Sequence, residues 1–217
     1  MEAVQVILPC WNEVAALPSV LASLPAGFTP LVVDNGSDDG SAEMARSLGA
    51  VVIDCPERGY GAACDAGLRA ATAPVVAVMD ADGSLDGADL PRLVAPILGR
   101  SADLSICSRR PAGRAAWSWR LRFANRRLAG QLSRRTGIKI IDLGPMRAAR
   151  REALLDLDLR DRRSGYPAET LIAAADAGWR ICQVDVGYAP RIGKSKITGT
   201  PLGALRAVQD LRAAIRS

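Results

Sequence analysis

The sequence predicts an α/β fold in which a mostly parallel central sheet carries helices on both faces. Two observations support this class. Short apolar runs alternate with helical patterns over the first hundred residues, and these runs contain no alternation of polar and apolar side chains. Strands of that kind belong to a parallel sheet that is covered on both sides. The repeated βα rhythm therefore predicts right-handed crossovers and a Rossmann-like arrangement.

Five apolar runs are the expected strands: residues 4–8, 31–33, 51–53, 75–79 and 103–107. Helical patterns follow the first four, near 14–23, from Ser41 as the capping residue, over 59–71 and near 88–98. Beyond residue 108 the rhythm breaks, and we expect helices over 115–135, 150–156, 168–177 and 202–215 and one strand near 180–188. Within 115–135, one face collects the apolar residues Trp117, Leu121, Ala124, Leu128 and Leu132. No repeat or linker divides the chain, which predicts a single domain over 1–217.

Composition excludes several kinds of chemistry. Histidine is absent, so Ser-His-Asp catalysis, Cys-His catalysis and HExxH zinc hydrolysis are ruled out. The five cysteines are scattered and form no CxxC pair, which predicts free and mostly buried thiols. No segment approaches the roughly 20 apolar residues that span a bilayer, and the N-terminus lacks the features of a signal peptide. We therefore expect a cytoplasmic protein, at most peripheral to the inner face of the membrane.

The net charge changes sign along the chain. Residues 1–100 carry 13 Asp and Glu against five Arg, a net charge of −8, whereas residues 101–217 carry 10 against 23 Lys and Arg, a net charge of +13. Such a basic half indicates a polyanionic partner, unless it is merely a solvated cationic face. Phosphate groups and an anionic membrane fit best. We do not expect nucleic acid, because few aromatic residues are interleaved with the basic ones.

Polar clusters follow three of the expected strands, in segments 9–13, 34–40 and 80–84. In an open parallel sheet ligands bind beyond the carboxyl ends of the strands, so these segments indicate one binding site. Asp80 and Asp82 stand one residue apart just past a buried strand, where they would repel each other without a cation between them. Hard oxygen ligands suit Mg²⁺ or Mn²⁺, which in turn favours a diphosphate as a further ligand.

The segment from Gly59 to Gly67 is a weaker signal. Cys64 stands where the third glycine of a dinucleotide-binding GxGxxG would be. Its place after a strand indicates a helix N-terminus that comes close either to a ligand or to another backbone, and helix packing alone explains it equally well.

Six motifs, in order along the chain, resemble the inverting family-2 glycosyltransferases with the GT-A fold: CWNE, VDNGSDDGS, GYGAACDAG, MDADGS, GYPAE and PRIGKSKITGT. The resemblance covers about residues 4–210 and is strongest toward dolichol- or polyprenyl-phosphate mannosyl- and glucosyltransferases. It implies a nucleotide-binding half over about 1–108 and an acceptor-binding half over about 109–217. It also implies a nucleoside-diphosphate sugar as the donor and Mg²⁺ or Mn²⁺ as the cofactor.

The resemblance assigns one group of residues to the nucleotide sugar: Pro9, Trp11, Glu13, Asp34, Asn35, Asp80, Ala81 and Asp82. Within it, Asp80 and Asp82 match the metal and diphosphate motif. Trp11 replaces the family's usual tyrosine and Asn35 its usual second aspartate, and Ser84 stands where the polyprenyl-phosphate enzymes commonly carry a glutamine.

A second group matches cations near the phosphates and the acceptor: Arg109, Arg191 and Lys196. The catalytic candidates are Asp82, Glu169, Arg191 and Lys196. Glu169 matches an acidic residue near the acceptor. It would be a general base for a hydroxyl acceptor, whereas a phosphate acceptor is already an anion and needs Glu169 only for orientation.

These expectations combine into a metal-dependent hexosyltransferase that inverts the anomeric carbon and uses a polyprenyl phosphate at a membrane surface as acceptor. The basic stretch 109–139 supports that acceptor, because it could lie against anionic lipid. Two alternatives stay open. One is the same donor chemistry with a soluble acceptor, and the other is a sugar-phosphate nucleotidyltransferase, although the early GxGxRL-type segment of that class is missing.

Overall fold

The computed structural model describes residues 2–111, 119–193, 209–211, 213 and 215. Its centre is a seven-stranded sheet with the strand order β3-β2-β1-β4-β6-β5-β7. The strands are β1 (Val4–Cys10), β2 (Phe28–Asp34), β3 (Val51–Asp54), β4 (Val75–Val78), β5 (Leu104–Pro111), β6 (Arg147–Arg150) and β7 (Ile181–Tyr188). All neighbouring pairs are parallel except those of β6, which is antiparallel to both β4 and β5. The predicted α/β class with a mostly parallel sheet is confirmed.

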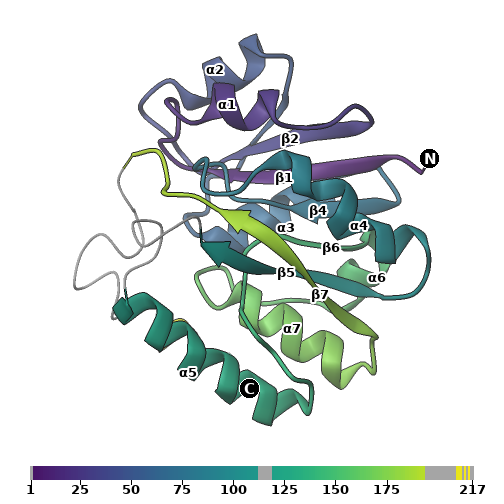
Figure 1. Ribbon diagram of the computed structural model, residues 1–217. Coiled ribbons are helices and arrows are strands. Elements are labelled where there is room, and N and C mark those ends of the chain that lie inside the picture. Colours follow the sequence, from purple (N-terminus) through teal and green to yellow (C-terminus); the bar gives the residue numbers. More distant parts are fainter. Residues whose placement is uncertain (1, 112–118, 194–208, 212, 214, 216–217) are drawn as a thin grey trace.

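Helices cover both faces of the sheet (Figure 1). One face packs against α1 (Leu17–Ala22), α2 (Ser41–Ser47) and α4 (Leu90–Leu98), with the short 3₁₀ turn η1 (Gly87–Asp89) before α4. The other face packs against α3 (Tyr60–Ala70), α6 (Arg151–Asp156) and α7 (Tyr166–Asp176), and α5 (Trp119–Thr136) lies against α7. Successive side chains of a strand point to opposite faces, so Ile7 joins the core under α3 while Val6 and Leu8 join the core under α1 and α4.

The direction of winding reverses at β1. The chain runs outward from β1 through β2 to β3 and then returns to place β4 on the other edge of β1. A crevice opens at such a switch point beyond the carboxyl ends of the strands. The loops that leave β1 and β4 at this point carry residues 11–13 and 80–82, so the topology brings two of the predicted polar segments together.

Several details differ from the expectations. β6 was missed, because its four residues have arginine at both ends and its stability comes from pairing with β4 and β5 on its two edges. The N-cap of α2 is Gly40, with a φ of 86°, and not Ser41. The Ser41 hydroxyl instead accepts a hydrogen bond from the Glu13 N–H and donates one to Asp39.

The apolar face predicted for the basic helix is correct only in part. In α5, Ala129 and Leu132 are buried and Leu128 is half-buried, whereas Ala124 is exposed. Burial therefore falls on the second half of the helix. Trp117 and the side chain of Leu121 lie outside the described residues, as does most of the helix expected over 202–215.

Candidate active site

Asp82 lies in the loop that follows β4 and is held from two directions. The residue is 8% exposed, and its Oδ1 accepts a hydrogen bond of 2.9 Å from the Ser84 N–H. Its backbone carbonyl accepts the Ile192 N–H at 2.8 Å, and the Ser84 carbonyl accepts the Ala189 N–H at 3.0 Å. The segment that follows β7 is thereby fastened along the acidic loop.

Asp80 lies two residues earlier and is half-buried. Its Oδ1 is buried and accepts no hydrogen bond from the described residues. Burial, followed by the negative charge of Asp82, raises the pKa of Asp80 to about 7. A carboxylate oxygen that is buried without a donor, beside a second carboxylate, is a good ligand for a hard divalent cation. Ala81, between the two, is 2% exposed and contributes packing through its side chain.

Arg191 supplies the positive charge that faces this loop. Its Nη1 lies 3.4 Å from Asp82 Oδ2, and its Nη2 donates a hydrogen bond of 2.7 Å to Glu13 Oε1. The guanidinium thus joins the loops after β1 and β4 to the segment after β7. Lys196, the other predicted cation of that segment, lies outside the described residues.

Trp11 and Pro9 lie at the carboxyl end of β1. The Trp11 ring is 40% exposed, and the Arg58 guanidinium carbon lies 4.7 Å from the ring centroid. Arg58 comes from the segment between β3 and α3, which the sequence analysis did not single out. Pro9 is part of β1 and pairs with Val33 of β2. The exposed indole and the cation above it form a flat surface at the rim.

Asp34 and Asn35, at the carboxyl end of β2, form hydrogen bonds with the backbone of neighbouring loops. Asp34 is 9% exposed, and both of its carboxylate oxygens lie 3.3 Å from the Ser37 N–H. The Asn35 amide donates to the Cys55 and Glu57 carbonyls at 3.1 and 2.6 Å and accepts the Gly59 N–H at 2.8 Å. A carboxylate at position 35 could not donate these two bonds. The departure from the family's usual aspartate therefore has a structural reason.

The N-terminus of α3 approaches another backbone, which decides between the two interpretations of the glycine segment. The Gly61 and Ala62 N–H groups donate to the Arg163 and Arg162 carbonyls at 3.1 and 2.9 Å. A Cβ at Gly59 would lie 2.0 Å from the Arg162 carbonyl oxygen. These amides are therefore engaged by the loop before α7 and do not point toward a ligand.

Arg109 lies near the carboxyl end of β5, at the same end of the sheet as the loops after β1 and β4. It forms an ion pair that the sequence did not predict. Its Nε and Nη2 each donate a hydrogen bond of 2.8 Å to the Asp142 carboxylate, which also accepts the Arg109 backbone N–H at 2.9 Å. Burial acts to lower the pKa of Arg109, but the hydrogen bonds and charge of Asp142 outweigh it and raise that pKa. The guanidinium carbon lies 5.2 Å from the Tyr188 ring centroid. Arg109 is therefore held rigidly beside the rim.

Glu169 is engaged by backbone donors. Its Oε1 accepts the Arg160 N–H at 2.9 Å and its Oε2 accepts the Asp161 N–H at 2.8 Å. The carboxylate thus fixes the same loop that closes over the N-terminus of α3. The sequence left two roles open for Glu169, a general base or an orienting group. This geometry fits the orienting group.

Arg147 is a further buried cation that the sequence analysis missed. It is 1% exposed, and its guanidinium donates to the carbonyls of Gly144, Pro145 and Pro167 at 2.9, 3.2 and 2.9 Å. It lies in β6 opposite Val78 of β4, two residues before Asp80. Arg147 therefore fixes the backbone before β6 and at the start of α7, next to the strand that leads to Asp80.

The site as a whole offers few protein ligands to a metal. No group of three or more Asp, Glu, His or Cys within the described ranges is arranged to hold an ion. A metal held by Asp80 and Asp82 would therefore take its remaining ligands from water or from a bound diphosphate.

Comparison with known proteins identifies the family. Residues 5–157 match the family model "Glycosyl transferase family 2". The chain is 51% identical to an uncharacterized glycosyltransferase of Mycobacterium tuberculosis, over 96% of each chain. It is 33% identical to a dolichyl-phosphate hexose transferase of Haloferax volcanii, over 88% of this chain and 85% of that one.

A solved structure extends the comparison to the fold. Glucosyl-3-phosphoglycerate synthase from Mycobacterium tuberculosis, in complex with Mn²⁺, uridine-diphosphate-glucose and phosphoglyceric acid, is 25% identical, with a TM-score of 0.74 over 99% of this chain and 80% of that one. The shared fold agrees with the predicted GT-A architecture. On the match of its sequence and of its fold, the chain belongs to glycosyltransferase family 2.

Proposed function

We propose that the chain transfers a hexose from a nucleoside-diphosphate sugar to a polyprenyl phosphate, with inversion at the anomeric carbon. The use of a nucleoside-diphosphate sugar as donor is supported mainly by the pair Asp80 and Asp82 at the switch point of the sheet. Arg191 faces Asp82 there at 3.4 Å. Membership in the glycosyltransferases also argues against the nucleotidyltransferase alternative.

The donor would lie across the crevice between the loops after β1, β2 and β4. Asp80 and Asp82 would hold Mg²⁺ or Mn²⁺, which when bound would stabilise the negative charge that develops on the diphosphate. Arg191 and Lys196 would add fixed positive charge on the same leaving group. Trp11, Glu13 and Asp34 would line the nucleoside, and residues 1–108 would form the nucleotide-binding half.

The acceptor half, over about 109–217, is proposed to bind a phosphate. An acceptor phosphate oxygen would form a bond to the anomeric carbon as the bond from that carbon to the diphosphate breaks, and the nucleoside diphosphate would leave with the electron pair. The nucleophile is already an anion, so no proton is removed. Glu169, whose two oxygens each accept a backbone N–H, fits a reaction without a general base. Arg109 would contribute positive charge near the incoming phosphate.

The exposed side of α5 supports a lipid acceptor. Arg122, Arg126 and Arg127 are exposed, and between them the Phe123 ring is 57% exposed. Basic side chains around an exposed aromatic ring suit the surface of an anionic membrane. Figure 1 shows α5 starting on the side of the molecule where β5 and β7 end. None of the described helices is long and apolar enough to cross a membrane, so contact through α5 would be peripheral.

A soluble acceptor is the second candidate. The likeness to a synthase solved with phosphoglyceric acid favours it, because a small phosphorylated acid would also present an anion to Arg109. Both candidates share the donor site and differ in whether the acceptor carries a lipid.

An acceptor comparison tests the proposal. The enzyme would be supplied with Mn²⁺ and radiolabelled nucleotide sugars, and transfer would be measured to undecaprenyl phosphate in detergent and to 3-phosphoglycerate in buffer. We expect label to enter the lipid phase. Label only in the soluble acceptor would replace the polyprenyl acceptor by the second candidate, and the donor site would be unaffected.

A further inference from the structure

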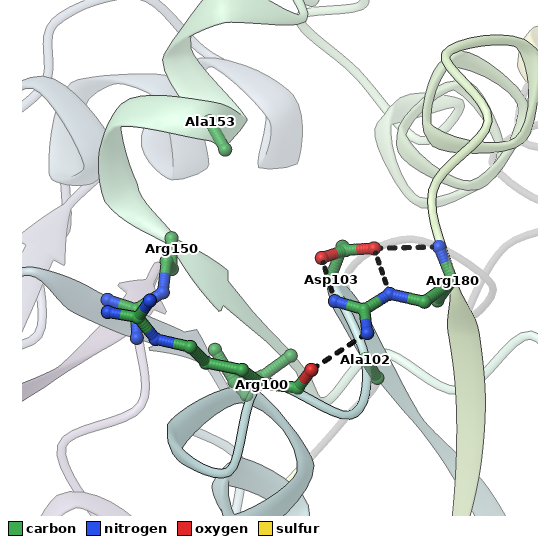
Figure 2. Close-up of a pocket in the computed structure, with 7 residues that line it drawn as sticks. Arg100, Ala102, Asp103, Arg150, Ala153 and Arg180 are labelled. Carbon is green, nitrogen blue, oxygen red and sulfur yellow. Dashed lines mark hydrogen bonds and ion pairs between the residues drawn. The ribbon is translucent and has the colours of Figure 1, made fainter.

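An open pocket of about 320 Å³ lies at the end of the sheet opposite the loops that carry Asp80 and Asp82 (Figure 2). It lies where β5 and β7 begin and β6 ends, and its charged lining residues are Arg100, Asp103, Arg150 and Arg180. Arg109 follows Asp103 by six positions along β5 (Leu104–Pro111), which corresponds to about 20 Å at 3.3 Å per residue. The pocket is therefore distinct from the candidate active site.

One arginine of the pocket is fully committed to an internal partner. Asp103 accepts hydrogen bonds from the Arg180 backbone N–H, Nε and Nη2 at 2.9, 2.9 and 2.8 Å. The remaining Nη1 of Arg180 donates to the Arg100 carbonyl at 2.8 Å. This pair forms one wall of the pocket in Figure 2 and leaves no negative charge on that wall to balance other cations.

The other two arginines are compensated less completely. Arg150 Nη1 lies 3.2 Å from Glu2 Oε2 at the protein surface, but Arg150 Nη2 is buried and donates to no described residue. The side chain of Arg100 has no hydrogen bond or ion pair with any residue in the described ranges. Figure 2 shows the guanidinium groups of Arg100 and Arg150 on the same side of the pocket. Arg100 is exposed and Arg150 is paired with Glu2, so this side of the pocket keeps a net positive charge and guanidinium N–H donors that suit an anion.

The backbone of Arg100 gives a second, independent indication. Arg100 follows the C-cap Gly99 of α4 and has a φ of 54°, in the left-handed region. Glycine or asparagine normally occupies this position after a helix, because a larger side chain is strained there. Here a strained backbone carries a long cationic side chain that lines the pocket. Such strain at a site suggests a function for the side chain that requires it.

We propose that this pocket binds a phosphate group, as inorganic phosphate or as the phosphomonoester of a small molecule. A phosphomonoester carries a charge of about −1.5 to −2 at neutral pH and three acceptor oxygens. Guanidinium groups present paired N–H donors that match such oxygens. A phosphate held by Arg100 and Arg150 balances the charge of Arg100, which has no ion-pair partner among the described residues, and accepts N–H groups from both side chains. The pocket has room for a small organic group beyond the phosphate.

The test is a direct binding measurement, so it does not depend on the proposed sugar transfer. Inorganic phosphate and glucose 6-phosphate would each be titrated by calorimetry into the Arg191→Ala protein, without metal or nucleotide and at ionic strength held constant with NaCl. The Arg191→Ala background reduces any competing phosphate binding at the catalytic rim. We expect saturable binding of at least one of the two in the millimolar range or tighter.

Two substitutions in that background locate the site. Arg100→Gly removes one guanidinium and relieves the left-handed backbone, so the unliganded protein should be at least as stable while its affinity for the anion falls about tenfold or more. Arg150→Gln should weaken binding by a similar factor. Arg134→Ala, an exposed arginine of α5, removes the same charge elsewhere and should leave binding unchanged. No saturable binding, or binding that survives both pocket substitutions, would overturn the proposal.

Discussion

Arg191 and Asp82 form an ion pair across two segments that are more than a hundred residues apart, with Arg191 Nη1 3.4 Å from Asp82 Oδ2. The same guanidinium reaches Glu13 at 2.7 Å, so a single cation holds the carboxylates of the loops after β1 and β4. In the proposed reaction this guanidinium would supply fixed positive charge toward the diphosphate. A donor and its metal would therefore bind among groups that are already oriented.

The first prediction follows from that arrangement. Arg191→Ala should slow sugar transfer on the order of 10²-fold, because it removes a fixed charge that stabilises the leaving group. Arg46→Ala removes an arginine whose exposed partner is Asp54, and it should have no effect on transfer. Steady-state rates with the best donor provide the measurement. Equal rates for the two variants would show that Arg191 is only a structural link.

Glu169→Gln separates a general base from an orienting group. Glutamine has one acceptor oxygen, so one of the backbone N–H groups of residues 160 and 161 would lose its partner and face an amide N–H instead. We expect the free energy of unfolding to fall by about 1–3 kcal/mol, while kcat falls less than about tenfold. A variant of unchanged stability with kcat lowered by about 10²–10⁴-fold would assign Glu169 the role of general base.

The close approach of α3 to the loop before α7 predicts opposite effects of two glycine substitutions. A Cβ at Gly61 would lie 2.1 Å from the Asp161 carbonyl oxygen, so Gly61→Ala should destabilise the protein by about 1–3 kcal/mol. Apart from the backbone of α5 itself, no atom of the described residues lies within 4 Å of a Cβ at Gly130, and Gly130→Ala should stabilise by about 0.5–1 kcal/mol. Chemical denaturation compares them. A neutral Gly61→Ala would mean that the contact is looser than described.

Much of the fold could be predicted from the sequence, because its central strands are continuous apolar runs and its acidic loops follow them directly. What could not be predicted depends on partners distant in sequence. β6 is four residues long and is stabilised by β4 and β5, about 70 and 40 residues away. The role of Asp142 is to pair with Arg109, and no residue near Asp142 in the sequence indicates that ion pair.

The same reasoning explains the candidate site. Asp80 and Asp82 are candidates from the sequence alone, because a two-carboxylate motif after a buried strand is local. Arg58 was not, since its position over the Trp11 ring depends on how the loops after β1 and β3 meet. The glycine segment was recognised as a close approach, but only the fold identifies the loop before α7 as the neighbouring backbone.

The exposed side of α5 predicts salt-sensitive membrane binding. Each basic residue near an anionic surface contributes about 1 kcal/mol, so Arg122→Ser combined with Arg126→Ser should weaken binding to phosphatidylserine vesicles about tenfold or more. Vesicle sedimentation at low and high salt provides the measurement, with Arg46→Ser as the control. Absence of vesicle binding by the unmodified protein would contradict the membrane assignment of α5 and favour a soluble acceptor.

The central claim is that Asp80 and Asp82 hold a divalent metal that binds a nucleoside diphosphate. Its most direct measurement is the thermal midpoint of the protein with UDP, GDP and dTDP, with and without Mn²⁺, for the unmodified chain, Asp82→Asn and Asp86→Asn. Asp86 is an exposed acid four residues further along and serves as the matched control. A ligand at a hundredfold excess over its dissociation constant stabilises the native state by about 2.7 kcal/mol. We predict that at least one nucleoside diphosphate raises the thermal midpoint of the unmodified chain, and that it does so only with Mn²⁺. Asp86→Asn should show the same increase, and Asp82→Asn should show none. An increase that needs no metal, or that persists in Asp82→Asn, would contradict the account.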